Sequence, residues 1–147
     1  MRMKGINQQR AVSQRGFTLL ELLVVIVIIG LLAAFVAPKY FGQIGRSRIQ
    51  IARAQIESLD KALDQYRIDT GHYPSTEAGL VALTVAPANE PMWHGSYLKK
   101  GVPLDPWGHP YSYKQPGDNG REFDIISFGA DGAPNGAGED ADITNWQ

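Results

Sequence analysis

The feature that most constrains this chain is an apolar run over residues 17–37, in which Glu21 is the only charged residue. As an α-helix, its 21 residues would extend about 31 Å at 1.5 Å per residue, which matches a bilayer hydrocarbon core of about 30 Å. The run therefore predicts a helix of membrane-spanning length, and only the residues outside it are expected to fold in water.

The charges of the chain are sorted by position. Overall, 14 basic residues stand against 15 acidic ones. Residues 1–16 hold four basic residues and no acid, so residues 17–147 carry ten basic residues against all fifteen acids, a net charge of −5. By the positive-inside rule, the basic side stays cytoplasmic and the acidic part is translocated. The lack of a basic excess argues against a nucleic-acid-binding protein.

A removed secretory signal peptide is the competing interpretation of this N-terminus. The apolar run is longer than an h-region of about 7–15 residues, no A-x-A pattern closes it, and a carboxylate near its start is unusual there. The chain also has no cysteine, which excludes disulfides, Cys-ligated metals and thiol catalysis but does not fix the compartment. We therefore favour a helix that remains attached to the domain after it.

Glu21 is the unusual residue of the apolar run, because a carboxylate inside hydrocarbon costs roughly 2.5–3.5 kcal/mol unless it is paired. It either lies one turn into the helix and reaches the headgroup zone, or awaits a cation from another chain. If the chain is cut after Gly16, Phe17 carries a free α-amine at the same depth. The α-amine of one copy would then pair with Glu21 of the next and set the register between identical helices.

An amphipathic stem is predicted over residues 38–70. Pro38 begins it and should kink or loosen the helix, and Gly42 and Gly45 weaken it further. Apolar residues then recur at helical spacing: Ile49, Ala52, Ile56, Leu59, Leu63 and Tyr66. This stripe predicts a helix that packs on its own domain, although a short coiled coil is also possible. Gly71 suits the C-terminal cap, so the helix should end near residue 70.

A second, short helix is predicted to begin at residues 74–77, because Ser75 is a good N-cap. Its apolar side would consist of Leu80, Val81 and Leu83. The loop that follows contains Trp93, which we interpret as a packing residue.

Two strands are predicted in the rest of the domain, which spans residues 71–147. They lie at residues 111–114 and 122–128, each bordered by turn-rich sequence. The expected fold class is α+β: a small antiparallel sheet laid against the stem helix, with a protruding hydrophobic tail.

The loop at residues 128–142 is rich in acids and glycines. Hard cations such as Ca²⁺ prefer six to eight oxygen ligands, and glycine turns let backbone carbonyls point inward. The loop lacks the spacing of an EF-hand. From composition alone, a solvated acidic loop remains the simpler alternative.

The N-terminal motif carries a family resemblance. Residues 15–21 (RGFTLLE), followed by the apolar residues 22–30, resemble the class III signal of type IV pilins and pseudopilins. The resemblance implies that a prepilin peptidase removes the leader, residues 1–16, by cutting after Gly16 and then methylates Phe17. It also implies that Glu21 is the carboxylate used in assembly, and that the stretch after Pro38 is compliant in the filament.

Further motifs follow in the order found in the protein G family, the major pseudopilins of type II secretion: residues 73–80 (YPSTEAGL), 97–98 (YL), 105–108 (DPWG), 127–132 (SFGADG) and 140–146 (DADITNW). The chain resembles this family through essentially all of its length after the leader. It departs from the family pattern at His109, where Asn is common, and in its long leader. The resemblance implies a pilin-like version of the α+β fold.

The resemblance also implies one structural calcium ion in the acidic loop. It assigns three carboxylates and two backbone carbonyls as ligands: Asp131, Asp140, Asp142, Phe128 and Ala133. Glu139 is a weaker candidate.

The same resemblance implies a structural subunit that polymerises with itself into a periplasmic pseudopilus and thereby drives protein export. Its implied partners are the minor pseudopilins, an inner-membrane platform with its assembly ATPase and the prepilin peptidase, and indirectly the secretin and the exoproteins. The subunit would sit in the inner membrane with its C-terminal domain in the periplasm.

No catalytic motif stands out: there is no H-E-x-x-H, no G-x-S-x-G and no phosphate-binding loop. We therefore expect the chain to be the substrate of an enzyme and not an enzyme. Two alternatives stay open. One is a type IV pilus subunit, which the lack of a C-terminal cysteine pair disfavours, and the other is a membrane-tethered calcium-binding or sugar-binding module.

Overall fold

The computed structural model describes residues 16–147, apart from the side chains of residues 38–41. The chain forms two compact units, Met1–Lys39 and Tyr40–Gln147. Its elements follow in the order α1 (Leu19–Thr70), η1 (Leu80–Leu83), β1 (Ser112–Lys114), η2 (Asp118–Gly120), β2 (Asp124–Ser127), η3 (Gly138–Asp140) and β3 (Ile143–Thr144), where η marks a short 3₁₀ helix. Apart from Gly16, the predicted leader lies outside the described residues.

The described part of the N-terminal unit consists mainly of the apolar beginning of α1, which is exposed. Every residue from 16 to 37 is exposed. By length and composition, α1 is the one helix among the described residues that is apolar enough to cross a membrane. Because apolar surface of this extent is rarely left in water, lipid or other protein chains are needed to cover it.

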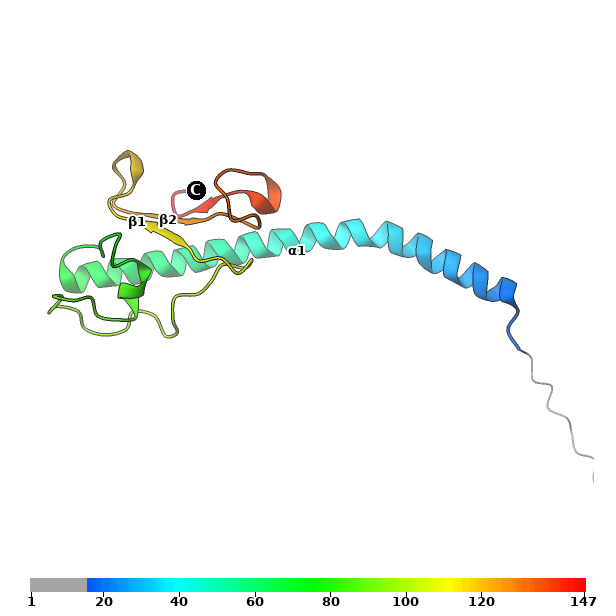
Figure 1. Cartoon of the computed structure of the whole chain (residues 1–147), viewed down its shortest axis with the longest axis horizontal. Coiled ribbons are helices and arrows are strands. Elements are labelled where there is room, and N and C mark those ends of the chain that lie inside the picture. The colour runs from blue at the N-terminus through cyan, green and yellow to red at the C-terminus, as the bar shows by residue number, and fades with distance from the viewer. Residues whose placement is uncertain (1–15) are drawn as a thin grey trace, which may run out of the picture. The chain divides into compact units, whose positions relative to one another are not determined.

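Within the C-terminal unit, α1 follows the predicted stripe. Ala52, Ile56, Leu59, Leu63 and Tyr66 are all buried, and they form one hydrophobic core with residues of the sheet and the loops. Figure 1 shows β1 and β2 running beside this part of the helix. The prediction of a stem that packs on its own domain is therefore confirmed.

The end of α1 is also as predicted. The helix stops at Thr70, and Gly71 adopts a left-handed conformation with φ of 85°. The Gly71 amide donates to the Arg67 carbonyl at 2.7 Å, which closes the last turn. The kink expected near Pro38 concerns the junction of the two units, and it stays a prediction.

The sheet has three antiparallel strands in the order β1-β2-β3. Tyr113 pairs with Ile125, and Ser127 pairs with Ile143. The two predicted strands are confirmed with shorter bounds, whereas β3 was not predicted. Its short Ile143–Thr144 segment completes the far edge of β2 and buries Ile143 in the core.

The segment after Pro74 is turn followed by 3₁₀ helix. The predicted cap is present, since the Ala78 amide donates to the Ser75 hydroxyl at 3.2 Å. In η1, Leu80 and Leu83 are buried as expected, but Val81 is 59% exposed and Ala82 is buried instead. Placing Val81 on the apolar side was therefore wrong, because side chains three positions apart align in a 3₁₀ helix.

Trp93 has the packing role predicted for it. Its ring is partly buried against the core, and its indole N–H donates to the Ala82 carbonyl at 2.9 Å.

Candidate functional site

Gly16, Phe17 and Thr18 precede α1 and are exposed, so the peptide bond predicted to be cut lies outside regular structure. The Phe17 side chain is 90% exposed. A peptidase needs a non-helical, accessible bond, and the described part of this motif provides one.

Glu21 belongs to a capping box. Its Oε2 accepts hydrogen bonds from the Thr18 amide at 2.8 Å and from the Thr18 hydroxyl at 2.9 Å, while the Glu21 amide donates to the Thr18 hydroxyl oxygen at 3.2 Å. This reciprocal arrangement satisfies free amides at a helix start. We did not predict Thr18 as a functional residue, although the T-x-x-E spacing at 18–21 is the known signal for such a box.

The Glu21 carboxylate keeps one oxygen available. Both donors from Thr18 go to Oε2. Within the part of the chain that the structure describes, no basic side chain pairs with Glu21. The capping box thus fixes the carboxylate at the first turn of the helix, and leaves it able to bind a cation from outside.

The acidic loop closes on itself through glycines. The Ala130 amide donates to the Glu139 carbonyl at 2.8 Å. Gly129 has φ of 66°, and a Cβ there would lie 2.6 Å from the same carbonyl oxygen. Gly136 has φ of 126°, and a Cβ there would clash with the carbonyl oxygen of Asp140. These contacts require glycine, so the loop composition reflects tight backbone packing as well as solvent exposure.

Two of the expected calcium ligands accept hydrogen bonds from backbone amides of the loop. Asp131 Oδ1 accepts from the Ala133 amide at 3.1 Å, and Asp142 Oδ2 accepts from the Asn135 amide at 3.0 Å. Among the described residues, no three acidic or histidine side chains are placed to hold a metal ion. Asp140 lies in η3.

One carboxylate oxygen of the loop is buried without a hydrogen-bond partner among the described residues. Asp142 Oδ1 is buried and has no hydrogen-bond donor in the structure. A buried carboxylate oxygen without a donor is costly, because the group has lost its hydration. The expected ligands are carboxylate and carbonyl oxygens, the donors that calcium prefers, so the donor set fits this ion in chemical kind.

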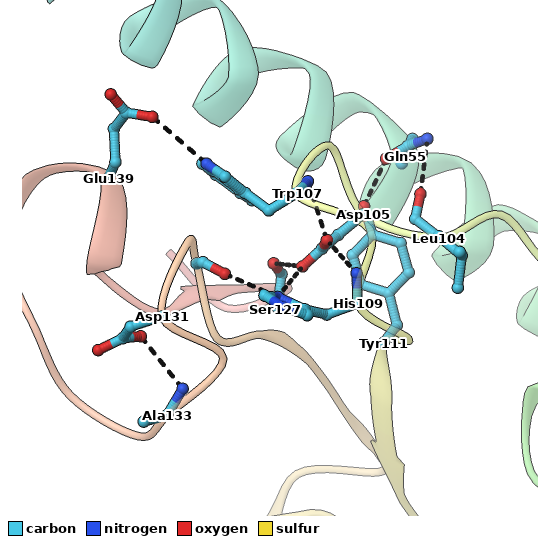
Figure 2. A network of polar contacts seen from close by, with 11 residues as sticks. Gln55, Leu104, Asp105, Trp107, His109, Tyr111, Ser127, Asp131, Ala133 and Glu139 are labelled. Carbon is cyan, nitrogen blue, oxygen red and sulfur yellow. Dashed lines mark hydrogen bonds and ion pairs between the residues drawn. The ribbon is translucent and has the colours of Figure 1, made fainter.

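A buried carboxylate supports the loop from the neighbouring turn. Asp105 Oδ1 accepts from the amides of Trp107 at 3.1 Å and of His109 at 2.8 Å, and Asp105 Oδ2 accepts from the Ser127 hydroxyl at 2.6 Å (Figure 2). Its side chain is fully buried. The carboxylate therefore ties the 105–111 turn to the end of β2, where the acidic loop begins.

His109 extends this support into the loop itself. Its Nδ1 lies 3.1 Å from the Gly129 carbonyl oxygen, and its ring lies against Gly132. From the sequence, His109 was only a departure from the family pattern. The structure shows that it bridges the turn and the loop.

On the other side of the turn, Tyr111 donates to Gln55 Oε1 on α1 at 2.5 Å. Burial, aided by the nearby Asp105 charge, raises the pKa of the Tyr111 hydroxyl, which therefore remains a donor.

Two protein-family models match this chain. A family model described as "Type II secretion system (T2SS), protein G" matches residues 39–146, most of the chain. The chain belongs to the type II secretion system protein G family. A second model, the prokaryotic N-terminal methylation motif, matches residues 12–37, which include Gly16, Phe17 and Glu21. The resemblance predicted from the sequence motifs is confirmed.

Individual protein G relatives agree over nearly their whole length. The type II secretion system core protein G of Pseudomonas aeruginosa is 46% identical over 138 residues, which cover 91% of this chain and 96% of the relative. The core protein G of Vibrio cholerae is 47% identical over 137 residues, which cover 91% of this chain and 92% of the relative.

The fold is shared with a solved structure. The crystal structure of the major pseudopilin from the type 2 secretion system of enterohaemorrhagic Escherichia coli matches with a TM-score of 0.59 and 35% identity. The match covers 72% of this chain and 92% of that one. The predicted pilin-like α+β class, a long N-terminal helix with a small antiparallel sheet, is therefore confirmed.

Proposed function

We propose that this protein G family member is the major pseudopilin of a type II secretion system. It is a structural subunit that polymerises with itself into a periplasmic pseudopilus and thereby drives export. The family match carries the proposal. The uncovered apolar helix that begins at the Thr18–Glu21 capping box provides the surface for polymerisation. In a filament, such helices leave lipid and bury one another, so apolar contact is retained.

Processing precedes assembly in this proposal. A prepilin peptidase cuts after Gly16 and methylates Phe17, and the mature subunit stays in the inner membrane with its C-terminal unit in the periplasm. The exposed, non-helical position of Gly16 and Phe17 and the methylation-motif match support this order of events. Intact-mass and N-terminal analysis of the cellular protein tests it. We expect N-methylated Phe17 as the first residue, and an unprocessed Met1 would overturn it.

Assembly uses the free oxygen of Glu21. The α-amine of Phe17 in one copy pairs with Glu21 of the next, so the capping box positions the carboxylate and the neighbouring chain supplies the cation. Such a pair adds little net stability because desolvation offsets attraction, but it fixes the register of otherwise uniform apolar helices.

The variant Glu21→Leu tests the pairing. It should be processed and inserted normally but should form few filaments in electron micrographs of overexpressing cells. Leu22→Ile, a change of apolar shape one residue on, is the matched control and should assemble as the wild type does. Normal filaments from Glu21→Leu would refute the pairing.

The subunit acts with other components of the secretion system. The minor pseudopilins, the inner-membrane platform and the prepilin peptidase contact it directly. The assembly ATPase acts through the platform, whereas the secretin and the exoproteins depend on the filament. It performs no catalysis and binds no nucleic acid in this role. Loss of exoprotein export on deletion, restored by the wild-type gene, is the expected result. Export that continues without the gene would contradict it.

The acidic loop binds one structural calcium ion. Asp131, Asp140 and Asp142 supply carboxylates, and Phe128 and Ala133 supply carbonyls. The buried Asp142 Oδ1 without a donor is the observation in favour. The ion would neutralise carboxylates that otherwise repel one another across a short loop.

Chelation tests the calcium site. Binding to the folded state alone stabilises by about 2.7 kcal/mol at a hundredfold excess over the dissociation constant, so excess EGTA should lower the melting temperature. Asp142→Asn should lose this response, whereas Asp118→Asn, a change of an exposed acid in η2, should retain it. An unchanged melting temperature of the wild type in EGTA would refute calcium binding.

A further inference from the structure

Gly45 occupies an unusual place on α1. It is buried, although its neighbours Ile44 and Arg46 are exposed. The side chain of Glu139 lies over it: a Cβ built at Gly45 would come within 2.5 Å of Glu139 Oε1, 2.6 Å of Cδ and 2.7 Å of Cγ. No real side chain packs at such distances, so the stem accepts Glu139 only because residue 45 has no side chain.

Two further groups surround the Glu139 carboxylate. The Trp107 indole N–H donates to Glu139 Oε2 at 3.4 Å, as Figure 2 shows. The Arg48 guanidinium, one helical turn after Gly45, lies 3.8 Å from the same oxygen. The stem, the 105–111 turn and the acidic loop therefore meet at one side chain.

The neighbouring glycine shows that this contact is particular to one position. Glycine is a poor helix former, and both Gly42 and Gly45 lie inside α1. A Cβ at Gly42 would meet nothing within 4 Å, so packing in the C-terminal unit gives no reason for glycine there. At Gly45 the reason for glycine is that the Glu139 side chain occupies the space that a Cβ would take.

We infer that Gly45 and Glu139 form a clasp that holds the acidic loop on the stem helix whether or not calcium is bound. The specific part of the clasp is steric. Arg48 and Glu139 are each more than two-fifths exposed, and an ion pair so exposed contributes little. Glu139 is thus an anchor of the loop and not one of its metal ligands.

The clasp gives the loop two separable supports. Calcium would order the segment around Asp131 and Asp142, while the clasp fixes η3 to α1. The Ala130 amide donates to the Glu139 carbonyl, so its hydrogen exchanges with solvent only when the loop opens at that point. The rate of this exchange is therefore sensitive to both the calcium ion and the clasp. The Trp107 indole N–H reports on the clasp alone, since it donates to the Glu139 side chain.

The test compares Gly45→Ala with Gly42→Ala in the full chain in detergent micelles. Gly45→Ala should displace Glu139, shift the Trp107 indole N–H resonance and speed amide exchange at Ala130 about tenfold, the factor expected from losing roughly one hydrogen bond to a charged group. Gly42→Ala makes the same chemical change where a Cβ meets no other atom within 4 Å, so it should alter neither the Trp107 resonance nor the Ala130 exchange rate. Equal behaviour of the two variants would overturn the clasp.

A double variant separates the clasp from a general effect on the helix. Glu139→Ala alone should reproduce the exchange and resonance changes. Adding Gly45→Ala to Glu139→Ala should produce no further change, because the side chain that it displaces is already gone. Additive effects would overturn the inference.

Repeating these measurements with calcium and with EGTA distinguishes the clasp from the calcium proposal. If calcium does not bind, wild-type exchange is the same in both, yet Gly45→Ala and Gly42→Ala still differ. If the clasp is wrong, those two variants agree in both conditions, whatever calcium does to the wild type.

Discussion

Asp105 offers the sharpest test of how the acidic loop is supported. Its fully buried carboxylate accepts three hydrogen bonds, from the amides of Trp107 and His109 and from the hydroxyl of Ser127. A hydrogen bond to a charged group contributes about 1.5–3 kcal/mol, and a buried donor that loses its acceptor costs about 1–3 kcal/mol. The Ser127 hydroxyl is 0% exposed and has no access to water as a substitute, whereas the two turn amides are nearer the surface.

Asp105→Ala should therefore lower the free energy of unfolding of the C-terminal unit by about 3–5 kcal/mol, a large share of the 5–15 kcal/mol typical of a domain. Asp105→Asn retains one acceptor oxygen for the turn amides and should cost less. The assay is urea unfolding of the full chain in detergent micelles, followed by tryptophan fluorescence. Asp118→Ala, which removes an exposed aspartate from η2, is the control.

A coupling measurement identifies the cause of the loss. Ser127→Ala removes the hydroxyl that Asp105 would otherwise leave without an acceptor, so the double variant should be more stable than the sum of the single losses predicts. A loss below about 1 kcal/mol for Asp105→Ala, or strictly additive losses, would refute the view that this carboxylate organises the turn.

Two further predictions concern the core and the pH dependence of stability. Leu63→Ala, at a position that is 0% exposed, should cost about 2–5 kcal/mol in the same unfolding assay, whereas Ile68→Ala, at 73% exposure on the same helix, should change stability by less than about 0.5 kcal/mol. The Arg121 guanidinium donates to the Asp124 carboxylate at 2.6 Å and holds the pKa of this buried group below its usual range. Ionised Asp124 therefore stabilises the fold at pH values above its unfolded pKa of about 3.9. That contribution is lost as the pH falls through the lower pKa of the folded state. Arg121→Gln should thus be less stable than the wild type at neutral pH, and the difference should shrink below about pH 4; a difference that stays constant down to pH 2 would contradict this.

Features encoded by local periodicity were predictable from the sequence. The stem stripe extends over several helical turns, so its period is clear from the order of the residues alone. Gly71 marked the helix end because a left-handed residue there is nearly always glycine. The T-x-x-E spacing at residues 18–21 is equally local. Its capping role was not predicted, because a carboxylate in an apolar run points first to a partner in another chain.

Features that depend on distant contacts were not predictable in the same way. β3 has only Ile143 and Thr144, too few residues to display the alternation of a strand, and it exists because the edge of β2 is there to pair with. The clasp joins Gly45 and Glu139, which are far apart in the sequence of the C-terminal unit. From the sequence alone, a glycine inside a helix indicates only a less stable helix, and the contact with the Glu139 side chain is visible only in the structure. Each of these contacts joins segments that are far apart in the sequence.

Apolar surface is buried within the C-terminal unit but exposed in the N-terminal unit. Folding of the subunit and its assembly with other copies therefore depend on different residues. In the C-terminal unit, the stripe from Ala52 to Tyr66 is buried by the unit's own sheet and loops, so its stability requires no second copy. In the N-terminal unit, every residue from 16 to 37 is exposed, and among the described residues only Thr18 donates hydrogen bonds to the Glu21 carboxylate. In the proposed pseudopilus, a subunit so divided would keep its water-facing part folded while its apolar helix exchanges lipid for other helices. Substitutions at Asp105 or Leu63 should therefore act through the amount of folded subunit, and substitutions at Glu21 through polymerisation of subunits that are already folded.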